Sequence, residues 1–174
     1  MGNEPVDRSQ SLGQTKVQFA ALSIVLLCLV WLAEMRIIEP QLATWSSDLI
    51  QPFFALPQAW FGPLLAGVSM LMGLAYFKVL LCSKTMIGHV LVLVRFVGQL
   101  ALGVLWCYLV FVLKNLPAGV MIGLQFAAVA LETGRIFSTF DRQAGLLMIP
   151  QIGWALYGFL YSAALLVENM LMTP

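Results

Sequence analysis

The chain alternates between five long apolar segments and short polar ones. The apolar segments predict helices at residues 17–38, 61–82, 86–113, 117–137 and 143–167. A helix needs about 20 mostly apolar residues to cross the roughly 30 Å hydrocarbon layer of a bilayer, and each of these segments is long enough. The pattern therefore predicts an all-α integral membrane protein, a bundle of five transmembrane helices.

The polar segments set the domain organisation. Residues 1–16 form a polar N-terminal tail, and residues 17–174 leave room for a single membrane domain. Residues 39–60, rich in proline, glutamine, serine and aromatic residues, form the only long connection. The short turn at Lys114–Leu116 makes the third and fourth helices antiparallel neighbours, and Pro150 predicts a bend in the fifth because proline removes a backbone hydrogen bond.

Composition agrees with this pattern and excludes some functions. Of the 174 residues, 61% are hydrophobic and 10% are charged, against roughly a quarter charged in soluble proteins. The net charge of +1 provides no basic field for nucleic acid, which is excluded as a partner. Cys28, Cys82 and Cys107 lie in apolar runs without metal-ligand spacing, so we expect buried cysteines and no metal site.

The basic residues near helix ends predict the orientation. One side of the membrane would hold Arg8, Lys16, Lys78, Lys84, Arg135 and Arg142, and the other Arg36 and Lys114. Because cytoplasmic loops carry an excess of Lys and Arg, this bias predicts a cytoplasmic N-terminus. We expect the membrane to be a bacterial cell membrane.

Polar groups inside the predicted spans are candidates for function, because a charge within the bilayer needs a partner. Arg95 and Glu132 lie at similar depths on antiparallel helices, so they can form an ion pair that is either structural or directed at a ligand. Gln99, Leu102 and Trp106 follow Arg95 at spacings of four, three and four, which makes one helical stripe. That stripe lines a cavity for a flat, partly charged molecule, or it packs on the fourth helix.

Two further features leave alternatives open. His89 lies near the membrane interface, as an axial haem ligand or as a surface histidine. Gly119, Gly123 and Ala127 form a small-residue face that allows close helix packing, within the bundle or between protomers.

Several motifs resemble the translocator protein family, also called tryptophan-rich sensory proteins. Gly98-Gln99-Leu100-Ala101-Leu102 with Trp106 resembles the family's G-Q-L-x-L-N-x-x-W, and Ala144-Gly145-Leu146-Leu147 with Pro150 and Trp154 resembles A-x-L-L-x-x-P-x-x-x-W. Further matches to the family's loop after the first helix are Trp45, Leu49, Pro52, Pro57, Gly62 and Pro63.

The chain also departs from the family's pattern. Gly103 stands where the family has an asparagine on the third helix, Phe54 replaces a loop tryptophan, and Ser162 replaces an asparagine on the fifth helix. No Lys or Arg follows Tyr161, as a cholesterol-binding motif would require, so we do not predict sterol binding.

The resemblance implies a five-helix bundle, often dimeric, that binds porphyrins, haem or similar flat hydrophobic ligands in a cavity closed by the loop after the first helix. The ligand-binding residues that it implies are Trp45, Pro52, Gln99, Trp106, Trp154 and Arg95, with Arg36 as an alternative cation. Indole faces stack on a macrocycle, and cations meet its propionates. No cofactor is required, and porphyrin or haem enters as a ligand.

Three functions compete at this stage. The first is a membrane-embedded sensor or carrier for tetrapyrroles, whose partners are the bilayer, the ligand and a second copy of the chain. The alternative is a non-enzymatic accessory or structural subunit of a larger membrane complex that has lost the pocket. An enzyme or ion-coupled transporter is disfavoured, because no nucleophile and base pair, metal cluster or phosphate loop is visible.

Overall fold

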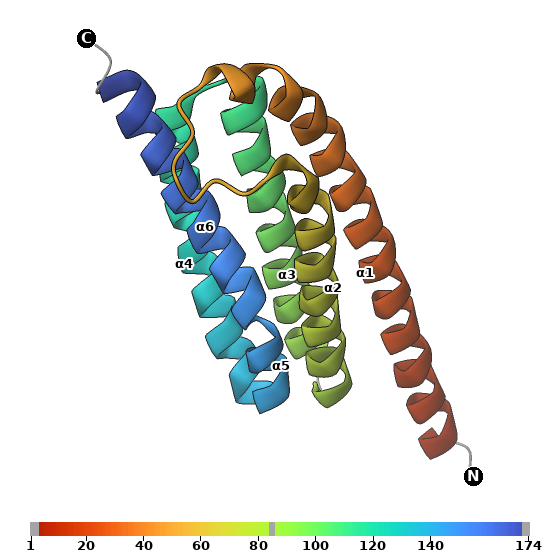
Figure 1. Cartoon of the computed structure of the whole chain (residues 1–174). Coiled ribbons are helices and arrows are strands. Elements are labelled where there is room, and N and C mark those ends of the chain that lie inside the picture. The colour runs from red at the N-terminus through yellow and green to blue at the C-terminus, as the bar shows by residue number, and fades with distance from the viewer. Residues whose placement is uncertain (1–3, 84–85, 172–174) are drawn as a thin grey trace.

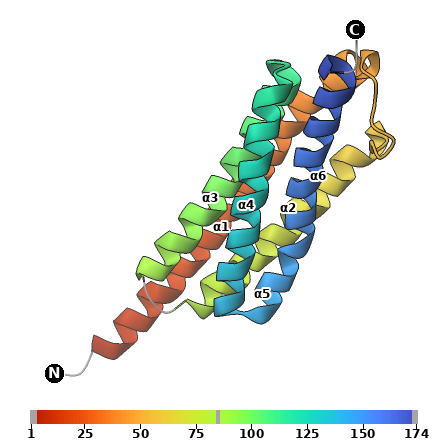
Figure 2. The same cartoon turned by 90° about the vertical axis from the view of Figure 1, so that its left-hand side faces the viewer.

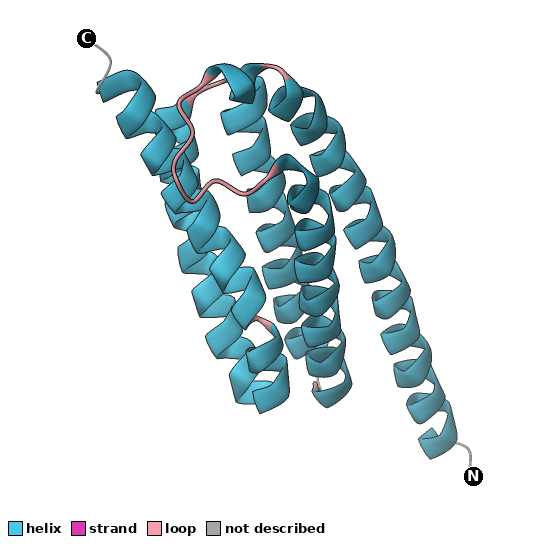
Figure 3. Cartoon of the chain, viewed as in Figure 1, coloured by secondary structure: helices cyan, strands magenta, loops and turns pink. Residues whose placement is uncertain are grey.

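A computed structural model describes residues 4–83 and 86–171, and in these ranges the chain is a bundle of helices with short connections (Figures 1 and 3). The helices are α1 (Glu4–Ala43), α2 (Gln58–Cys82), α3 (Met86–Cys107), α4 (Leu116–Phe140), α5 (Arg142–Leu147) and α6 (Ile149–Leu166). A 3-10 turn covers Trp45–Asp48, and π-helical segments extend α3 over Tyr108–Val112 and α6 over Val167–Leu171. The two ends of the chain lie at opposite ends of the bundle (Figure 1).

Five stretches of helix in the described residues are long and apolar enough to span a membrane. They are Ala21–Gln41, Gln58–Cys82, Gly88–Val112, Leu116–Phe140 and Arg142–Asn169. The fold class predicted from the hydrophobic pattern is therefore confirmed: the protein is an all-helical, multi-pass integral membrane protein.

The first helix is longer than the predicted span of residues 17–38. It begins at Glu4, inside the polar tail, and continues through Pro40 to Ala43, inside the predicted loop. Hydropathy marks the part of a helix that lies in lipid, but a formed helix propagates into polar residues at little cost. The predicted boundaries therefore mark the apolar part of the first helix and not the residues at which the helix begins and ends.

The turn between α3 and α4 has the predicted antiparallel geometry. Lys114 adopts a left-handed conformation with φ of 53°, which reverses the chain within three residues. The Asn115 side chain then caps α4 by accepting a hydrogen bond of 3.1 Å from the Ala118 amide, and Pro117 occupies the first turn.

The last span is interrupted close to the predicted bend at Pro150. Helix α5 ends at Leu147, Met148 forms the junction, and α6 begins at Ile149 with proline in its first turn. The proline has no amide proton, and its ring crowds the preceding turn, so the regular hydrogen-bond ladder stops there. The span is thus two helices with a break between them, not one bent helix over 143–167.

The small-residue face of α4 packs inside the bundle. A Cβ atom on Gly123 would lie 2.9 Å from the Phe159 Cα of α6, and one on Gly119 would lie 2.5 Å from Val110 Cγ2. Helices α4 and α6 run side by side in both views (Figures 1 and 2). The glycines therefore bring these two helices together, and the expected homodimer, which stays a prediction, would need another surface.

Helix α1 is the least embedded of the spans. Only 17% of its most apolar stretch is buried in the protein, against 39% for the spans in α3 and α4. It lies at the edge of the bundle, beside α2 (Figure 1). The bundle is therefore tight around α4 and α6 and loose around α1.

We predict that Gly123→Ala destabilises the protein, because the new methyl group would meet the backbone of α6, which cannot move aside as a side chain can. The expected loss is about 1–3 kcal/mol, typical of overpacking. Thermal unfolding in detergent, followed by circular dichroism, measures it.

The matched control is Gly98→Ala on α3, where a Cβ would meet nothing within 4 Å. Because alanine favours the helix over glycine, this variant should melt at the same temperature as the wild type or slightly higher. Equal melting temperatures for both variants would contradict the close packing of α4 on α6.

Candidate functional site

A small cavity lies at the centre of the bundle, where α1, α2, α3, α4 and α6 meet. Its volume of about 20 Å³ is enough for roughly one water molecule. It is lined by Glu34, Leu65, Ser69, Met72, Gln99, Leu100, Gly103, Trp106, Cys107, Phe126, Gln151 and Trp154. Three of the predicted site residues, Gln99, Trp106 and Trp154, therefore share one cavity, but a macrocycle does not fit into it as it stands.

Trp106 is fixed in the wall of this central cavity. Its side chain is buried, and its indole Nε1 donates a hydrogen bond of 2.9 Å to Ser162 Oγ. The Ser162 hydroxyl in turn donates to the Gly158 carbonyl at 2.9 Å. Ser162, which stands where the family pattern has an asparagine, thus still serves as a polar anchor for the tryptophan.

Trp154 begins a row of stacked rings along α6. Its ring stacks on Tyr157, with centroids 5.7 Å apart, and Tyr157 stacks on Tyr161 at 5.8 Å. The Tyr157 hydroxyl accepts a hydrogen bond from the Leu56 amide at 3.1 Å, and the Tyr161 hydroxyl donates to Gln51 Oε1 at 3.1 Å. These bonds attach the long loop to α6.

Trp45 and Pro52 lie in that loop, above the central cavity and not in its wall. The Trp45 ring meets Phe111 edge to face at 6.3 Å, and Lys114 Nζ lies 5.8 Å from the ring centroid. Pro52 is buried, and its carbonyl accepts a hydrogen bond of 2.8 Å from the Ala55 amide. Both residues close one end of the bundle.

Arg95 forms the predicted ion pair and is turned away from the central cavity. Its two terminal nitrogens bind both Glu132 oxygens, at 2.9 Å and 3.2 Å. Both side chains are partly exposed on the outside of the bundle, at 29% and 57%. Of the two alternatives, this geometry favours the structural pair, and only Gln99 and Trp106 of the predicted stripe reach the cavity.

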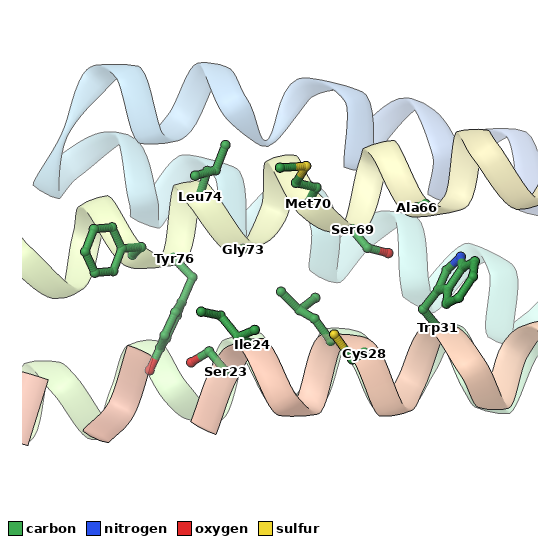
Figure 4. Close-up of a pocket in the computed structure, with 12 residues that line it drawn as sticks. Ser23, Ile24, Cys28, Trp31, Ala66, Ser69, Met70, Gly73, Leu74 and Tyr76 are labelled. Atoms are coloured by element: carbon green, nitrogen blue, oxygen red, sulfur yellow. The ribbon is translucent and has the colours of Figure 1, made fainter. Parts of the chain in front are cut away.

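A much larger cavity opens between α1 and α2, and we call it the α1/α2 groove. Its volume is about 560 Å³, and it is lined by Ser23, Ile24, Leu27, Cys28, Trp31, Ala66, Ser69, Met70, Gly73, Leu74, Tyr76 and Phe77. Figure 4 shows Ser69 and Tyr76 directed from α2 towards α1, with Trp31 of α1 at one end of the groove. The indole Nε1 of Trp31 is buried and has no hydrogen-bond partner among the described residues.

The α1/α2 groove shares lining residues with two other cavities. Ser69 lines both the groove and the central cavity. A further cavity of about 460 Å³ shares Trp31 and Ala66 with the groove and reaches Arg36 and Glu39. The three cavities are therefore neighbours along the α1/α2 contact, with Ser69 in the wall between the groove and the central cavity.

Sequence reasoning missed this groove because its residues look like any lipid-facing surface. Ala66, Ser69 and Gly73 are small residues at spacings of three and four, on the face of α2 that meets α1. Such a face usually indicates close helix packing. Here it faces large side chains that leave a hollow, which only the structure reveals.

His89 and the cysteines differ from the predictions. His89 is fully buried, and its Nε2 lies 3.1 Å from the Ser83 carbonyl oxygen, so it is not a surface histidine. It joins the end of α2 to the start of α3. Cys28 and Cys82 are exposed and only Cys107 is buried, because the apolar runs that hold them face lipid as well as protein. Among the described residues, no group of three metal-binding side chains gathers.

Two comparisons with known proteins agree with this architecture. The sequence profile of the TspO/MBR family matches residues 19–167. A curated relative, the tryptophan-rich protein TspO of Archaeoglobus fulgidus, is 27% identical over 126 residues, which cover 72% of this chain and 80% of the relative.

We predict that the hydrogen bond between Trp106 and Ser162 stabilises the folded protein. Ser162→Ala leaves the buried indole without an acceptor, which costs about 1–3 kcal/mol of unfolding free energy. Trp106→Phe removes the donor. In thermal unfolding, the double variant should lose less stability than the two single variants together, since the shared bond is lost only once. Additive losses would contradict the bond.

Proposed function

Because the chain belongs to the TspO/MBR family, we propose that it is a membrane-embedded binding protein, a sensor or carrier, for tetrapyrroles such as porphyrin or haem or for similarly flat hydrophobic ligands. The observation that supports this most directly is the α1/α2 groove. Its volume of about 560 Å³ falls within the roughly 300–1,000 Å³ typical of small-molecule sites. Its aromatic and aliphatic lining suits a flat, apolar ligand.

The arrangement of the groove suggests how such a ligand would lie. The macrocycle would enter from the lipid between α1 and α2, with the Trp31 ring at its edge. Arg36, which lines the adjoining cavity, would meet the propionates. Glu39 lines the same cavity and would limit that attraction.

The predicted site residues take different places in this proposal. Gln99, Trp106 and Trp154 would be reached through Ser69 when α1 moves outward, and Trp45 and Pro52 would keep the loop closed over the bundle. Arg95 has no part in the site, because Glu132 occupies its guanidinium group on the outer surface.

We propose binding without catalysis. The described residues that line the groove include no Asp, Glu, His, Lys or Arg, which leaves Cys28 and Tyr76 as its candidates for a general acid or base. Its chemistry is that of apolar contact and ring stacking.

A second candidate is supported by the small central cavity. Its volume of about 20 Å³ is what a filled core would leave in an accessory subunit that has lost its pocket. In that case the outer surface, including the Arg95–Glu132 pair, would contact another membrane protein. A stoichiometric partner recovered in mild detergent, together with the absence of ligand binding, would favour this function.

We predict that protoporphyrin quenches the tryptophan fluorescence of the purified protein saturably, because Trp31 lies at the groove. Ala66→Phe, which fills the groove, should weaken the apparent affinity at least about tenfold, as expected for a steric clash of about 1.4 kcal/mol or more. Trp31→Leu and Trp106→Leu should each reduce the quenching.

The matched control is Gly67→Phe, one position further on α2, where a Cβ atom would meet nothing within 4 Å and the residue is exposed on the outside of the bundle. It should bind like the wild type. If quenching in the wild type does not exceed that of an unrelated membrane protein, the proposed function is wrong. If added lipid displaces the porphyrin and restores the tryptophan fluorescence, the groove is a site for acyl chains.

We also propose that the N-terminus is cytoplasmic, on the basis of the bias of Lys and Arg. Lys84, which contributes to that bias, lies outside the described residues. Five spans place the two termini on opposite sides of the membrane. A green fluorescent protein, which fluoresces only when it folds in the cytoplasm, should therefore be bright at the N-terminus and dark at the C-terminus. The reverse pattern would invert the topology.

A further inference from the structure

A buried carboxyl group lies at the centre of the membrane domain, and none of the functions above uses it. Glu34 of α1 is 5% exposed and lines the central cavity. Its Oε1 lies so close to α3 that a Cβ atom on Gly103 would be 2.9 Å away. The family's motif has an asparagine at the position of Gly103. Because glycine has no side chain, the carboxyl group of Glu34 can lie against α3 at this point.

The surroundings of Glu34 offer it hydrogen-bonding groups but no positive charge. Gln99, which is 1% exposed, lines the same cavity, and neither its Oε1 nor its Nε2 has a hydrogen-bond partner among the described residues. Gln151 adds a second amide to the wall. Among the described residues that line the cavity, there is no Lys, Arg or His.

Such an arrangement is costly in the absence of a partner. A buried amide with no hydrogen bond costs about 1–3 kcal/mol, and an unpaired carboxylate in a membrane interior costs more. Native interiors rarely leave a buried polar group such as the Gln99 amide unpaired, and each such group calls for an explanation, for example a water molecule or an ion that binds there. Glu34, Gln99 and Gln151 all line the same central cavity.

We propose that this cavity binds the primary ammonium group of a ligand whose apolar body lies in the α1/α2 groove. The ammonium group would pair with the Glu34 carboxylate and donate a hydrogen bond to the Gln99 Oε1. This inference rests on the proposed function, since it assigns a second, deeper subsite to the same binding protein. Ser69 lines both the groove and the central cavity, so the two subsites are adjacent.

The size and charge of the cavity select this group over others. A primary ammonium group is about as large as a water molecule, and a volume of about 20 Å³ holds roughly one water. A trimethylammonium group has the same charge but is too large and has no N–H donor. A carboxylate is repelled by Glu34, so the propionates of a tetrapyrrole would stay near Arg36.

The test uses three pyrene probes with the same flat apolar body: 1-pyrenemethylamine, its N,N,N-trimethyl derivative and 1-pyrenemethanol. Energy transfer from tryptophan to pyrene in the purified protein gives the affinity of each. The wild type should bind the primary amine at least about tenfold more tightly than the alcohol or the trimethyl probe, as a charged hydrogen bond predicts. In Glu34→Gln this preference should fall to about one.

The protoporphyrin titration separates this inference from the proposed function. If porphyrin and all three probes bind the wild type with no preference for the amine, the ammonium site is wrong and the groove remains. If neither porphyrin nor any probe binds saturably, the proposed function fails as well. If Glu34→Gln keeps the full preference for the amine, another group carries it and the assignment of Glu34 is overturned.

A second variant keeps the test valid should Glu34→Gln fold poorly. Gly103→Ala places a methyl group 2.9 Å from Glu34 Oε1, which displaces the carboxyl group and should reduce the preference for the amine while porphyrin still binds. Gly98→Ala on the same helix, whose Cβ would meet nothing within 4 Å, should keep the wild-type preference. Equal behaviour of the two alanine variants would contradict the contact between Glu34 and Gly103.

Discussion

The absence of water in the bilayer core is the constraint on which this structure depends. Every polar group within a span must find its partner in the protein, because lipid offers none. Several of them do so here through side chains on neighbouring helices, whereas Trp31 Nε1 and the Gln99 amide have no partner among the described residues. Arg95 and Glu132 pair across α3 and α4, Trp106 and Ser162 across α3 and α6, and Lys78 binds Gln143 at 2.6 Å. The polar contacts thus orient the helices, while apolar packing holds them together.

The same constraint explains why the packing is uneven. Gly123 lets α4 approach α6 closely enough for backbone contact, and two aromatic residues of α6, Tyr157 and Tyr161, are attached to the loop by hydrogen bonds. Helix α1 also makes close contacts, with Leu27 against Gly73 and Glu34 against Gly103, but its face towards α2 still leaves the groove open. In a membrane protein an open groove between two helices is filled by lipid or by a ligand, so the α1/α2 groove is accessible from the bilayer.

The sequence predicted the helices well and the site only in part. Length and hydropathy identify a membrane span directly, and for this reason the five spans were found, while the extension of α1 to Glu4 left no trace in hydropathy. The pairing of Arg95 with Glu132 followed from depth alone. The direction in which the Arg95 side chain points could not be predicted. A residue between two helices can face the central cavity or the outside of the bundle without any change in the sequence spacing. The groove depends on shapes that two helices make together, and no single segment encodes it.

Glu34 shows how the polar groups of a central cavity can change while the fold is kept. A polar side chain can enter the central cavity from α3 or from α1, provided that the facing residue on the other helix is small. Here the small residue is Gly103 of α3, and Glu34 of α1 supplies the carboxyl group. The two arrangements differ in one physical respect. A group on α3 is held in the tight part of the bundle, whereas Glu34 belongs to the helix with the least buried span. A cation that binds Glu34 would therefore draw α1 towards α3 and stabilise the closed form of the groove. Recognition and closure would then depend on the same helix.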